Sequence, residues 1–514
     1  MKYQNKISLL FTLILIGLIS TGNLFSQMRN ITGYELVDDM KIGWNLGNSF
    51  DSLGGDETAW GNPVTTKAII DMIASKGFKT VRIPVSWGEH VGPGPSYTID
   101  PQRLSRVKTV VDYCMANSMY AIVNMHHENE WLVPTYAKEA ESTKELLAIW
   151  KQIAEYFRNY DDYLLFETMN EPRVEGSAME WNGGTEENRD VINHFNQVAL
   201  DTIRSTGGNN SKRWVLITPH AATSMDIVIR NLAIPNDPYI LVSQHTYYPY
   251  FFCLDTGGTA AWGTEKDKID MDLELDRVAD FWKAKGIPVV VGEWASIEKN
   301  NTAARVAHAE YYAGGLRNRG MLGIWWDNGW TGDGGLAILD RKTLTWHRPE
   351  IADALIKGVN QPQSSPFPGY DCSALPEWSA STVYSAAGAQ VRYNGKMYEN
   401  RWYTSGENPE ENSGSNEVWI YIGPCAGGLT PDTPSPTPVP DITPTPVDRI
   451  MGDVDRSGAV NVVDSLLIAQ YYVNQIPAVF YPEAADVNCD NSINIVDALL
   501  VAQYYVSLIS KFPC

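Results

Sequence analysis

The stretch YLLFETMNEP at residues 163–172 decides which fold the rest of the sequence predicts. Its first half is a short, continuous apolar run, which is typical of a strand buried on both faces of a parallel sheet. Its second half carries Asn170 and Glu171, so the polar groups come where that strand ends. A buried strand with reactive side chains at its carboxyl end is the repeating unit of a (β/α)8 barrel, whose catalytic face lies at that end.

Seven further apolar runs of the same kind occur between residues 28 and 360. Segments with helical periodicity separate them, such as TTKAIIDMIASKGF (65–78) and TKELLAIWKQIAEYF (143–157). The seven runs cover residues 40–47, 80–87, 120–128, 213–219, 239–247, 287–294 and 320–329. Eight alternating strand and helix units predict an α/β fold, a (β/α)8 TIM barrel.

Polar and aromatic residues gather toward the carboxyl ends of six of these strands. One such residue is weak evidence, because strand ends often carry polar caps, but six strands together indicate a functional site. The residues are Arg82, His126, His127, Glu128, Asn170, Glu171, His245, Tyr247, Glu293 and Trp326.

Two of these residues, Glu171 and Glu293, have the placement that cleavage of a glycosidic bond needs. One carboxyl group gives a proton to the leaving oxygen, and the other attacks the anomeric carbon or activates water. Glu171 follows the fourth strand and Glu293 ends the seventh, and these strands face each other across an eight-stranded barrel. The alternative for Glu171 alone is a salt bridge at a helix N-terminus.

Several short motifs in residues 30–360 resemble glycoside hydrolase family five, within the larger clan of retaining barrel glycosidases. They are RIPVSW on the second strand, HHE after the third, NEP after the fourth and GEW after the seventh. WGNPVTT, IVNMHHE and WWDNG are similar to its bacterial and rumen-fungal endoglucanase branch. The segment HTYYPYFF resembles the loop after the sixth strand, whereas its continuation CLDTGGTAAWG matches no branch of the family.

The resemblance implies a role for each residue of the predicted site. Glu171 would be the acid/base and Glu293 the nucleophile, with Arg82 and Tyr247 orienting Glu293. The remaining residues would contact the substrate: Asn170 at the sugar 2-hydroxyl, His126 and His245 along the cleaved subsite, and Trp326 as a stacking platform. His127 could take the role given to His126, because the sequence does not tell which ring points inward.

Charge considerations add expectations about protonation and metals. Arg82 beside Glu293 would keep that carboxyl group ionised, and Glu171 needs a raised pKa to hold its proton near neutrality. No cofactor is expected for catalysis, and the HHE motif lacks the i, i+4 histidine spacing of a helical zinc site.

The whole chain has 514 residues and a formal net charge of −21, which disfavours nucleic acid and anionic membranes as partners. Its start reads as a secretory signal peptide over residues 1–27, with Lys2 and Lys6 before a short apolar run; a membrane anchor is the alternative. The signal predicts a secreted, extracellular protein. Export also means an oxidising environment, in which the 6 cysteines can pair.

Two Pro-rich stretches divide the chain into folded units. A short linker at 361–370 would separate a barrel at 28–360 from a small module at 371–425. A longer Pro/Thr linker at 426–449 would precede a C-terminal module at 450–514.

The small module at 371–425 is rich in aromatic residues and has Cys372 and Cys425 at its two ends, so we expect a small β module linked by a disulfide between them. It is too short to bury all its rings in one core. It resembles the cellulose- and chitin-binding modules of carbohydrate-binding families five and twelve. The resemblance implies that Tyr384, Trp402 and Tyr403 are exposed stacking aromatics and that Trp378 and Trp419 belong to the core.

The C-terminal module repeats itself: DVDRSGAVNVVDSLLIAQYYV and DVNCDNSINIVDALLVAQYYV align at a spacing of 33 residues. Both copies carry oxygen ligands at the calcium-loop positions one, three, five, nine and twelve, followed by a helix. This pattern predicts two structural Ca2+ ions. The expected ligands are Asp453, Asp455, Ser457, Asn461 and Asp464 in the first loop, and Asp486, Asn488, Asp490, Asn494 and Asp497 in the second.

The duplicated loop resembles a dockerin, the module that binds a cohesin-bearing scaffold protein. Val462, Val463, Ile495 and Val496 stand where hydroxyl residues are frequent, and Ala469, Gln470, Ala502 and Gln503 where basic pairs are frequent. These apolar residues either define a different partner or build a core between the helices. The sequence leaves open whether Cys489 and Cys514 form a disulfide bond.

Three functions remain in competition. The first is a retaining endo-β-1,4-glucanase that hydrolyses cellulose or related β-glucans. The second is a β-mannanase, xyloglucanase or mixed-linkage glucanase on the same fold, because one barrel supports many specificities. The third is a non-catalytic carbohydrate-binding scaffold protein, against which the intact pair Glu171 and Glu293 argues.

Overall fold

The structure is a computed structural model that describes residues 28–361, 369–410, 412–413, 418–426, 451–454, 460–472, 481, 484–489, 492–505, 508–509 and 511–513. The predicted signal peptide lies outside the described residues, as do most of the short linker and almost all of the Pro/Thr linker. None of the described helices is long and apolar enough to cross a membrane. The chain divides into two compact units, residues 1–429 and 430–514.

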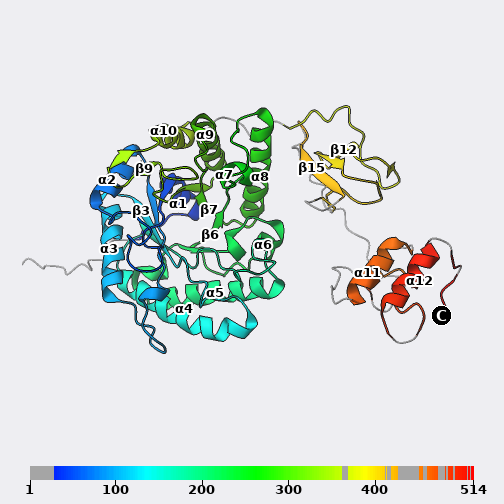
Figure 1. Cartoon of the computed structure of the whole chain (residues 1–514), viewed down its shortest axis with the longest axis horizontal. Coiled ribbons are helices and arrows are strands. Elements are labelled where there is room, and N and C mark those ends of the chain that lie inside the picture. The colour runs from blue at the N-terminus through cyan, green and yellow to red at the C-terminus, as the bar shows by residue number, and fades with distance from the viewer. Residues whose placement is uncertain are drawn as a thin grey trace, which may run out of the picture. The chain divides into compact units, whose positions relative to one another are not determined.

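Eight parallel strands form a closed barrel in chain order, as predicted (Figure 1). Each strand lies inside one of the apolar runs, because a strand covered on both faces needs apolar side chains on both. The strands are β1 (Ile42–Leu46), β2 (Thr80–Ile83), β3 (Tyr120–Asn124), β4 (Leu164–Glu167), β5 (Val215–Ile217), β6 (Ile240–His245), β7 (Val289–Trp294) and β8 (Leu322–Asp327).

Helices form a ring outside the strands (Figure 1). Several begin at a side-chain cap: Thr185 and Thr264 each cap the N-terminus of a helix in a reciprocal capping box. The helices of the barrel are α2 (Lys67–Lys76), α3 (Pro101–Ala116), α4 (Tyr136–Phe157), α5 (Glu186–Ser205), α6 (Asp226–Asn231), α7 (Tyr250–Cys253), α8 (Glu265–Ala284), α9 (Thr302–Asn318) and α10 (Pro349–Asn360). A short hairpin of β9 (Leu339–Asp340) and β10 (Thr345–Trp346) precedes α10.

The barrel interior changes from apolar to polar along the strands. Helix α1 (Gly33–Met40) packs against an apolar cluster that includes Ile122, Leu165 and Leu241. Side chains alternate between the two faces of a strand, so the same interior face reappears two residues later. There it carries Asn124, Glu167 and Ser243, all fully buried. The polar layer therefore lies two residues nearer the carboxyl ends of the strands than the apolar cluster, directly beneath the predicted site.

The small module folds as short antiparallel strands closed by a disulfide. Cys372 and Cys425 are bonded, with their Cα atoms 5.5 Å apart, as their places at the two ends of the module suggested. The strands are β11 (Val383–Tyr384), β12 (Gln390–Tyr393), β13 (Lys396–Asn400), β14 (Thr404–Ser405) and β15 (Trp419–Pro424). A small core of Val391, Tyr398 and Trp419 holds β12, β13 and β15 together.

The C-terminal unit contains a helix after each repeat, α11 (Val462–Tyr472) and α12 (Ile495–Tyr505). Its core is apolar and includes Val454, Ile468 and Val501. Cys489 is disulfide-bonded, and Cys514, the candidate partner that the sequence left open, lies outside the described residues. The unit is small, so loop structure has to contribute to its stability along with this limited core.

Candidate active site

Glu293, the last but one residue of β7, points into the barrel and is held from two sides. Nη1 of Arg82 on β2 donates to its Oε1 at 2.9 Å, and the Tyr247 hydroxyl donates to its Oε2 at 3.1 Å. The carboxyl group is buried, with 6% of the residue exposed. Each carboxylate oxygen therefore has its own donor, and rotation of the group would break both bonds.

Gly292 precedes Glu293 and permits this close packing. A Cβ atom at Gly292 would lie 2.9 Å from Oγ of Ser243 and 3.1 Å from Nε2 of His245. Any side chain at this position would therefore push on His245. The amide of Asn45 on β1 also donates to the Gly292 carbonyl at 2.8 Å, which fixes the end of β7.

Arg82 is the centre of the polar layer beneath the site and has no exposed surface. Besides Glu293, its guanidinium donates to Glu167 at 2.8 Å, to Asn45 at 3.1 Å and to Asn170 at 2.7 Å. Burial lowers the pKa of Arg82, but the charges of Glu167 and Glu293 outweigh burial and raise it above the ordinary value. The arginine is thus a fixed positive charge beside Glu293.

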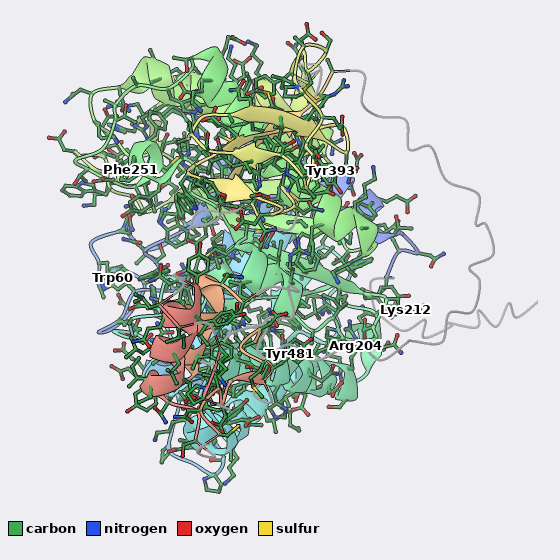
Figure 2. The ribbon with its side chains drawn as sticks, turned by 90° about the vertical axis from the view of Figure 1, so that its right-hand side faces the viewer. Trp60, Arg204, Lys212, Phe251, Tyr393 and Tyr481 are labelled. Carbon is green, nitrogen blue, oxygen red and sulfur yellow. A yellow bond between two sulfur atoms is a disulfide. The ribbon has the colours of Figure 1, made fainter. Side chains whose placement is uncertain are left out.

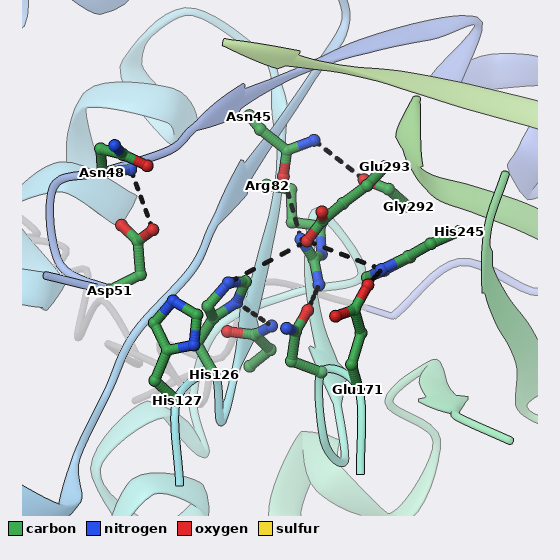
Figure 3. A network of polar contacts seen from close by, with 12 residues as sticks. Asn45, Asn48, Asp51, Arg82, His126, His127, Glu171, His245, Gly292 and Glu293 are labelled. Atoms are coloured by element: carbon green, nitrogen blue, oxygen red, sulfur yellow. Dashed lines mark hydrogen bonds and ion pairs between the residues drawn. The ribbon is translucent and has the colours of Figure 1, made fainter. Parts of the chain in front are cut away.

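Glu171 follows β4 and faces His245, the last residue of β6. Nδ1 of His245 lies 2.7 Å from Oε1 of Glu171 and 3.7 Å from Oε1 of Glu293 (Figure 3). Arg173 approaches Glu171 from another direction, with Nη1 3.7 Å from Oε2. One ring nitrogen therefore faces both carboxyl groups.

The two carboxyl groups are close to each other. A carboxylate oxygen of Glu171, a carboxylate oxygen of Glu293 and a nitrogen of His245 all lie within 4.8 Å of one another. Carboxyl groups about 5 Å apart are typical of retaining glycosidases, whereas inverting enzymes separate them by about 6.5–9.5 Å to admit a water. The same three groups could offer ligands to a metal, but the Arg82 guanidinium in contact with Glu293 opposes a cation there.

The pKa directions in the site differ from those expected from the sequence. Burial raises the pKa of Glu171, but the hydrogen bond with His245 outweighs it and brings the pKa below the ordinary value. Burial also raises the pKa of Glu293, and the charges of His245 and Arg82 offset only part of that effect. The cause is His245: burial lowers its pKa, yet Glu293 and Glu171 together raise it above the ordinary value. The imidazole and Glu171 thus form a pair that holds a proton next to the site.

Of the two neighbouring histidines, His126 is the one that faces Glu293. Its Nε2 lies 4.0 Å from Oε1 of Glu293, while its Nδ1 lies 3.1 Å from the Asn124 amide nitrogen. Its ring stacks on that of Trp326, with centroids 5.7 Å apart and planes 7° apart. His127 is turned away toward Trp60, with ring centroids 5.7 Å apart.

Glu128, the last residue of the HHE motif, binds backbone and indole N–H groups of the neighbouring loops. Its carboxylate accepts from the backbone N–H of Trp87 and Gly88 and from the Trp131 indole. Burial raises its pKa to about 7. It therefore joins the loops that follow β2 and β3 and does not face the carboxyl pair.

Exposed aromatic residues occupy the loops at the same end of the barrel. Trp60 follows β1 and Phe251 lies in α7 after β6; the residues are 44% and 64% exposed. Figure 2 shows both side chains toward the same side of the view. Flat aromatic surfaces near a site of this kind are suited to contact sugar rings.

Sequence reasoning missed four polar residues that hold this site. Asn45, Glu167 and Ser243 are buried in the layer around Arg82, and Arg173 contacts Glu171. A signal existed for the first three, because a charged or polar residue inside an apolar strand run needs a buried partner. Arg173 adjoins the NEP motif and could have been found from its place in the sequence.

In the small module, two of the three predicted stacking residues are exposed. Trp402 is 50% and Tyr403 60% exposed. The prediction for Tyr384 was wrong: it is only 8% exposed, its ring packs edge-on against Trp419, and its hydroxyl accepts from the Ser379 N–H. Trp419 is fully buried as expected, and Trp378 packs against the same core. The module is so small that a ring on β11 is needed as core.

The two C-terminal loops have matching structures at the last predicted ligand. Asp464 accepts from the backbone N–H groups of Val454 and Asn461, each at 2.8 Å. Asp497 accepts from those of Val487 and Asn494, at 3.1 and 3.0 Å. Both carboxylates are fully buried, and Asp453 is 5% exposed. Buried acidic oxygens at equivalent places in two loops fit a hard cation such as Ca2+.

The other predicted ligands are divided between described and undescribed residues. Asp486, Asn488 and Asn494 are described, whereas Asp455, Ser457 and Asp490 lie outside the described residues. Ile495 and Val496 are 52% and 48% exposed, so these two residues do not build a core between the helices.

A (β/α)8 barrel that brings two carboxyl groups together at the carboxyl ends of its strands, Glu293 buried and Glu171 with 19% of its side chain exposed, fits the class of glycoside hydrolases. Comparison with known proteins agrees. Residues 45–332 match the family model described as cellulase (glycosyl hydrolase family 5). The chain belongs to this family. Residues 377–419 match carbohydrate-binding module family 5/12, and residues 451–505 match the dockerin type I domain.

Individual relatives show the extent of the similarity. The chain is 51% identical over 346 residues to cellulase/esterase CelE of Acetivibrio thermocellus, a match that covers 66% of this chain and 42% of that protein. It is 47% identical to endoglucanase A of Clostridium longisporum, over 65% of this chain and 66% of that protein. It therefore spans less than two thirds of the length of either relative.

A solved structure matches the barrel over its whole length. The GH5-4 broad specificity endoglucanase from Clostridium acetobutylicum is 49% identical to this chain, with a TM-score of 0.63. The match covers 64% of this chain and 100% of that structure.

Proposed function

We propose that the protein is a secreted endo-β-1,4-glucanase that hydrolyses cellulose or related β-glucans with retention of configuration. Glu171 is the acid/base and Glu293 the nucleophile. One observation carries the proposal: the carboxyl groups of Glu171 and Glu293 approach within 4.8 Å, and only Glu293 is held by Arg82 and Tyr247. A nucleophile has to be ionised and fixed, whereas an acid/base has to exchange its proton.

The first half of the reaction forms a covalent glycosyl ester. A carboxylate oxygen of Glu293 attacks the anomeric carbon while the bond to the leaving oxygen breaks, and Glu171 gives its proton to that oxygen. Burial of the pair strengthens the bonds from Arg82 and Tyr247 to the reacting carboxylate. The proton that Glu171 delivers is the one that it shares with His245 across a contact of 2.7 Å.

The second half restores the enzyme. Glu171, now ionised, takes a proton from water, and the water oxygen attacks the same anomeric carbon from the side that the leaving group left. Two inversions give net retention. Formation of the ester removes the negative charge of Glu293, which no longer contributes to the raised pKa of His245. His245 therefore stays neutral in this half, while Glu171 takes up the proton from water.

The other residues of the site bind the sugar. Asn170 accepts from Arg82 through its oxygen, so its amide N–H is available to the 2-hydroxyl. His126 and Trp326, stacked on one another, offer a ring edge and a flat face beside Glu293. His245 contacts both carboxyl groups, and His127 lies one ring further out.

The second candidate function is hydrolysis of several β-glucans by the same site. A structurally similar enzyme bears the description broad specificity endoglucanase. Xyloglucan and mixed-linkage glucan are therefore candidate substrates along with cellulose, whereas mannan requires an axial 2-hydroxyl to fit the Asn170 contact.

A panel of soluble glycans tests the proposal. We expect release of new reducing ends from carboxymethylcellulose and barley mixed-linkage glucan, with internal cleavage and β-configured products in proton NMR of fresh hydrolysate. Mainly α-configured product would contradict retention. Activity confined to mannan would contradict the glucanase, and inactivity on every glycan would favour a non-catalytic scaffold protein.

The two further modules place the enzyme on its substrate and on a partner. The exposed pair Trp402 and Tyr403 would stack on an insoluble polysaccharide such as cellulose. The dockerin-like module would bind two Ca2+ through its acidic loops and attach the enzyme to a cohesin-bearing scaffold. Half-exposed Ile495 and Val496 on α12 favour a scaffold surface with an apolar patch. A protein with these modules acts outside the cell, where the polysaccharide is.

A further inference from the structure

Arg173 connects Glu171 to a loop that the reaction described above does not use. Its Nη1 donates to the Glu171 carbonyl at 2.9 Å and lies 3.7 Å from Oε2 of the same residue. Its Nε donates to Glu180 at 3.0 Å, and its side chain is 12% exposed. The guanidinium is therefore placed by several contacts at once, next to the carboxyl group that would deliver the proton.

Trp181 lies against the same guanidinium. The Cζ atom of Arg173 is 4.4 Å from the centroid of the Trp181 ring, within stacking range. Despite this contact, 57% of Trp181 is exposed. An indole ring with one face on an arginine leaves its remaining apolar surface to whatever enters the site.

The loop that carries Trp181 is internally bonded. Glu180 accepts from the Gly176 N–H at 2.8 Å, and the Gly184 N–H donates to the Met179 carbonyl at 3.0 Å. At its far end, Arg189 on α5 donates to the carbonyls of Gly183 and Gly184 at 2.9 and 2.8 Å. A loop fixed at both ends holds its exposed ring at small entropic cost, which is what a binding platform requires.

Gly184 shows that the loop packs tightly on the barrel. Its φ is +66°, a left-handed conformation that suits glycine, and a Cβ atom there would lie 2.4 Å from the ring of His220. His220 follows β5 and is 2% exposed. The position of Trp181 is therefore set by contacts with the barrel as well as by Arg173.

We propose that Trp181 is the stacking platform for the leaving-group part of the glucan and that Arg173 is its positioning residue. The inference rests on the proposed function. Glu171 gives its proton to the leaving oxygen, so the sugar that departs lies on the Glu171 side of the cleaved bond. Arg173 ties Trp181 to that side, whereas His126, on which Trp326 stacks, lies beside Glu293. A β-1,4-linked glucosyl ring presents C–H groups on both faces, which suit an indole face.

Kinetics with two kinds of leaving group test the assignment. In Trp181→Ala, we expect KM for cellohexaose to rise about tenfold, the effect of losing one stacking contact. Hydrolysis of an aryl β-cellobioside, whose leaving group is a phenol and not a sugar, should stay within about twofold of the parent. Tyr34→Ala is the matched control, because Tyr34 is an aromatic residue 39% exposed on α1 at the other end of the barrel.

A second readout uses the glycosyl ester, which a sugar acceptor can attack in place of water. The acceptor has to occupy the leaving-group subsite, so Trp181→Ala should form less transfer product from added cellobiose than the parent, and Trp181→Phe an intermediate amount. Unchanged KM and unchanged transfer would overturn the proposal. An equal loss on cellohexaose and on the aryl cellobioside would also overturn it, because a purely structural role acts on both substrates.

Arg173 variants separate positioning from charge. Arg173→Lys keeps the charge but loses the planar stack, so it should raise KM for cellohexaose and leave the pH limb that reports Glu171 in place. Arg173→Met also removes a charge that lowers the pKa of Glu171, so the pH limb that reports Glu171 should move to higher pH. Equal pH profiles in Arg173→Lys and Arg173→Met would contradict the electrostatic part. If the parent enzyme hydrolyses neither cellohexaose nor the aryl cellobioside, the proposed function itself is refuted.

Discussion

Nδ1 of His245 lies 2.7 Å from Oε1 of Glu171, so the imidazole and the carboxyl group can hold one proton between them. Glu171 follows strand β4 and His245 ends strand β6, and the two residues are 74 positions apart in the chain. This relationship places a titrating ring beside the proposed acid/base carboxyl group, and it determines how the site should respond to pH.

Replacement of His245 by Asn should move the acid limb of kcat/KM to higher pH. Burial raises the pKa of Glu293, and the charge of His245 offsets part of that rise. Without the imidazolium the pKa of Glu293 rises further, and the nucleophile becomes ionised only at higher pH. The pH profile of aryl β-cellobioside hydrolysis measures the shift. An acid limb that stays in place would show that His245 is uncharged in the free enzyme.

Glu171→Gln and Glu293→Gln should both inactivate the enzyme toward glucan, with different residual activities. Loss of a general acid costs about 10²–10⁴ in rate when the leaving group needs a proton. Glu171→Gln should therefore retain much more activity on a dinitrophenyl cellobioside, whose leaving group departs without protonation, whereas Glu293→Gln should be inactive on both substrates. Circular dichroism checks the fold. The same loss on both substrates in Glu171→Gln would contradict its role as acid.

Removal of the small module should weaken binding to insoluble cellulose and spare activity on soluble glucan. A chain lacking residues 371–425, and the double variant Trp402→Ala with Tyr403→Ala, should both show this separation, because the exposed rings supply the contact. Val383→Ala, at a residue 54% exposed in the same module, is the control. Equal cellulose binding by the double variant and the parent would show that the rings do not contact the polysaccharide.

Calcium removal should unfold the C-terminal module and leave the barrel active. Buried Asp464 and Asp497 are each placed within an acidic loop, where the carboxylates repel one another without a cation. Binding free energy then becomes folding free energy. Calorimetry of the full chain with and without chelator should show loss or lowering of one transition, with glucanase activity retained. A transition unmoved by chelator would mean that the loops need no metal.

Stability of the barrel should fall as the pH drops from about 6.5 toward 4. Burial lowers the pKa of both His308 and His220 to about 4. In this window the unfolded chain binds protons that the folded protein does not, so the stability present above pH 6.5 is lost on acidification.

His308→Gln can keep the hydrogen bond to the Tyr248 carbonyl, which His308 Nε2 makes at 2.9 Å, and it removes the titration. The melting temperature of this variant should therefore fall less between pH 7.5 and 4.5 than that of the parent. The full effect of one such group is at most about 3 kcal/mol. His194→Gln, whose side chain is 46% exposed, is the control. Identical pH dependence in His308→Gln and the parent would rule out His308 as the source.

The sequence by itself determined the architecture and pointed to the pair of carboxyl groups proposed as reactive. Buried parallel strands have to be apolar throughout, so eight apolar runs were visible without a structure, and each observed strand lies inside one of them. Glu171 and Glu293 stood out because a carboxyl group at the end of an apolar run has no local partner. The repeat at 33 residues and the two end cysteines were equally local signals.

Only the tertiary structure decided which side chains meet and what environment each one has. It turned His126 toward Glu293 and His127 away, placed Tyr384 in a core, and joined Arg173 to Trp181 across a folded loop. The protonation of Glu171 likewise depends on His245, a residue from another strand. Burial, stacking and pKa are set by neighbours that are distant in the chain. The sequence of one strand does not specify how far its side chains lie from those of the other strands.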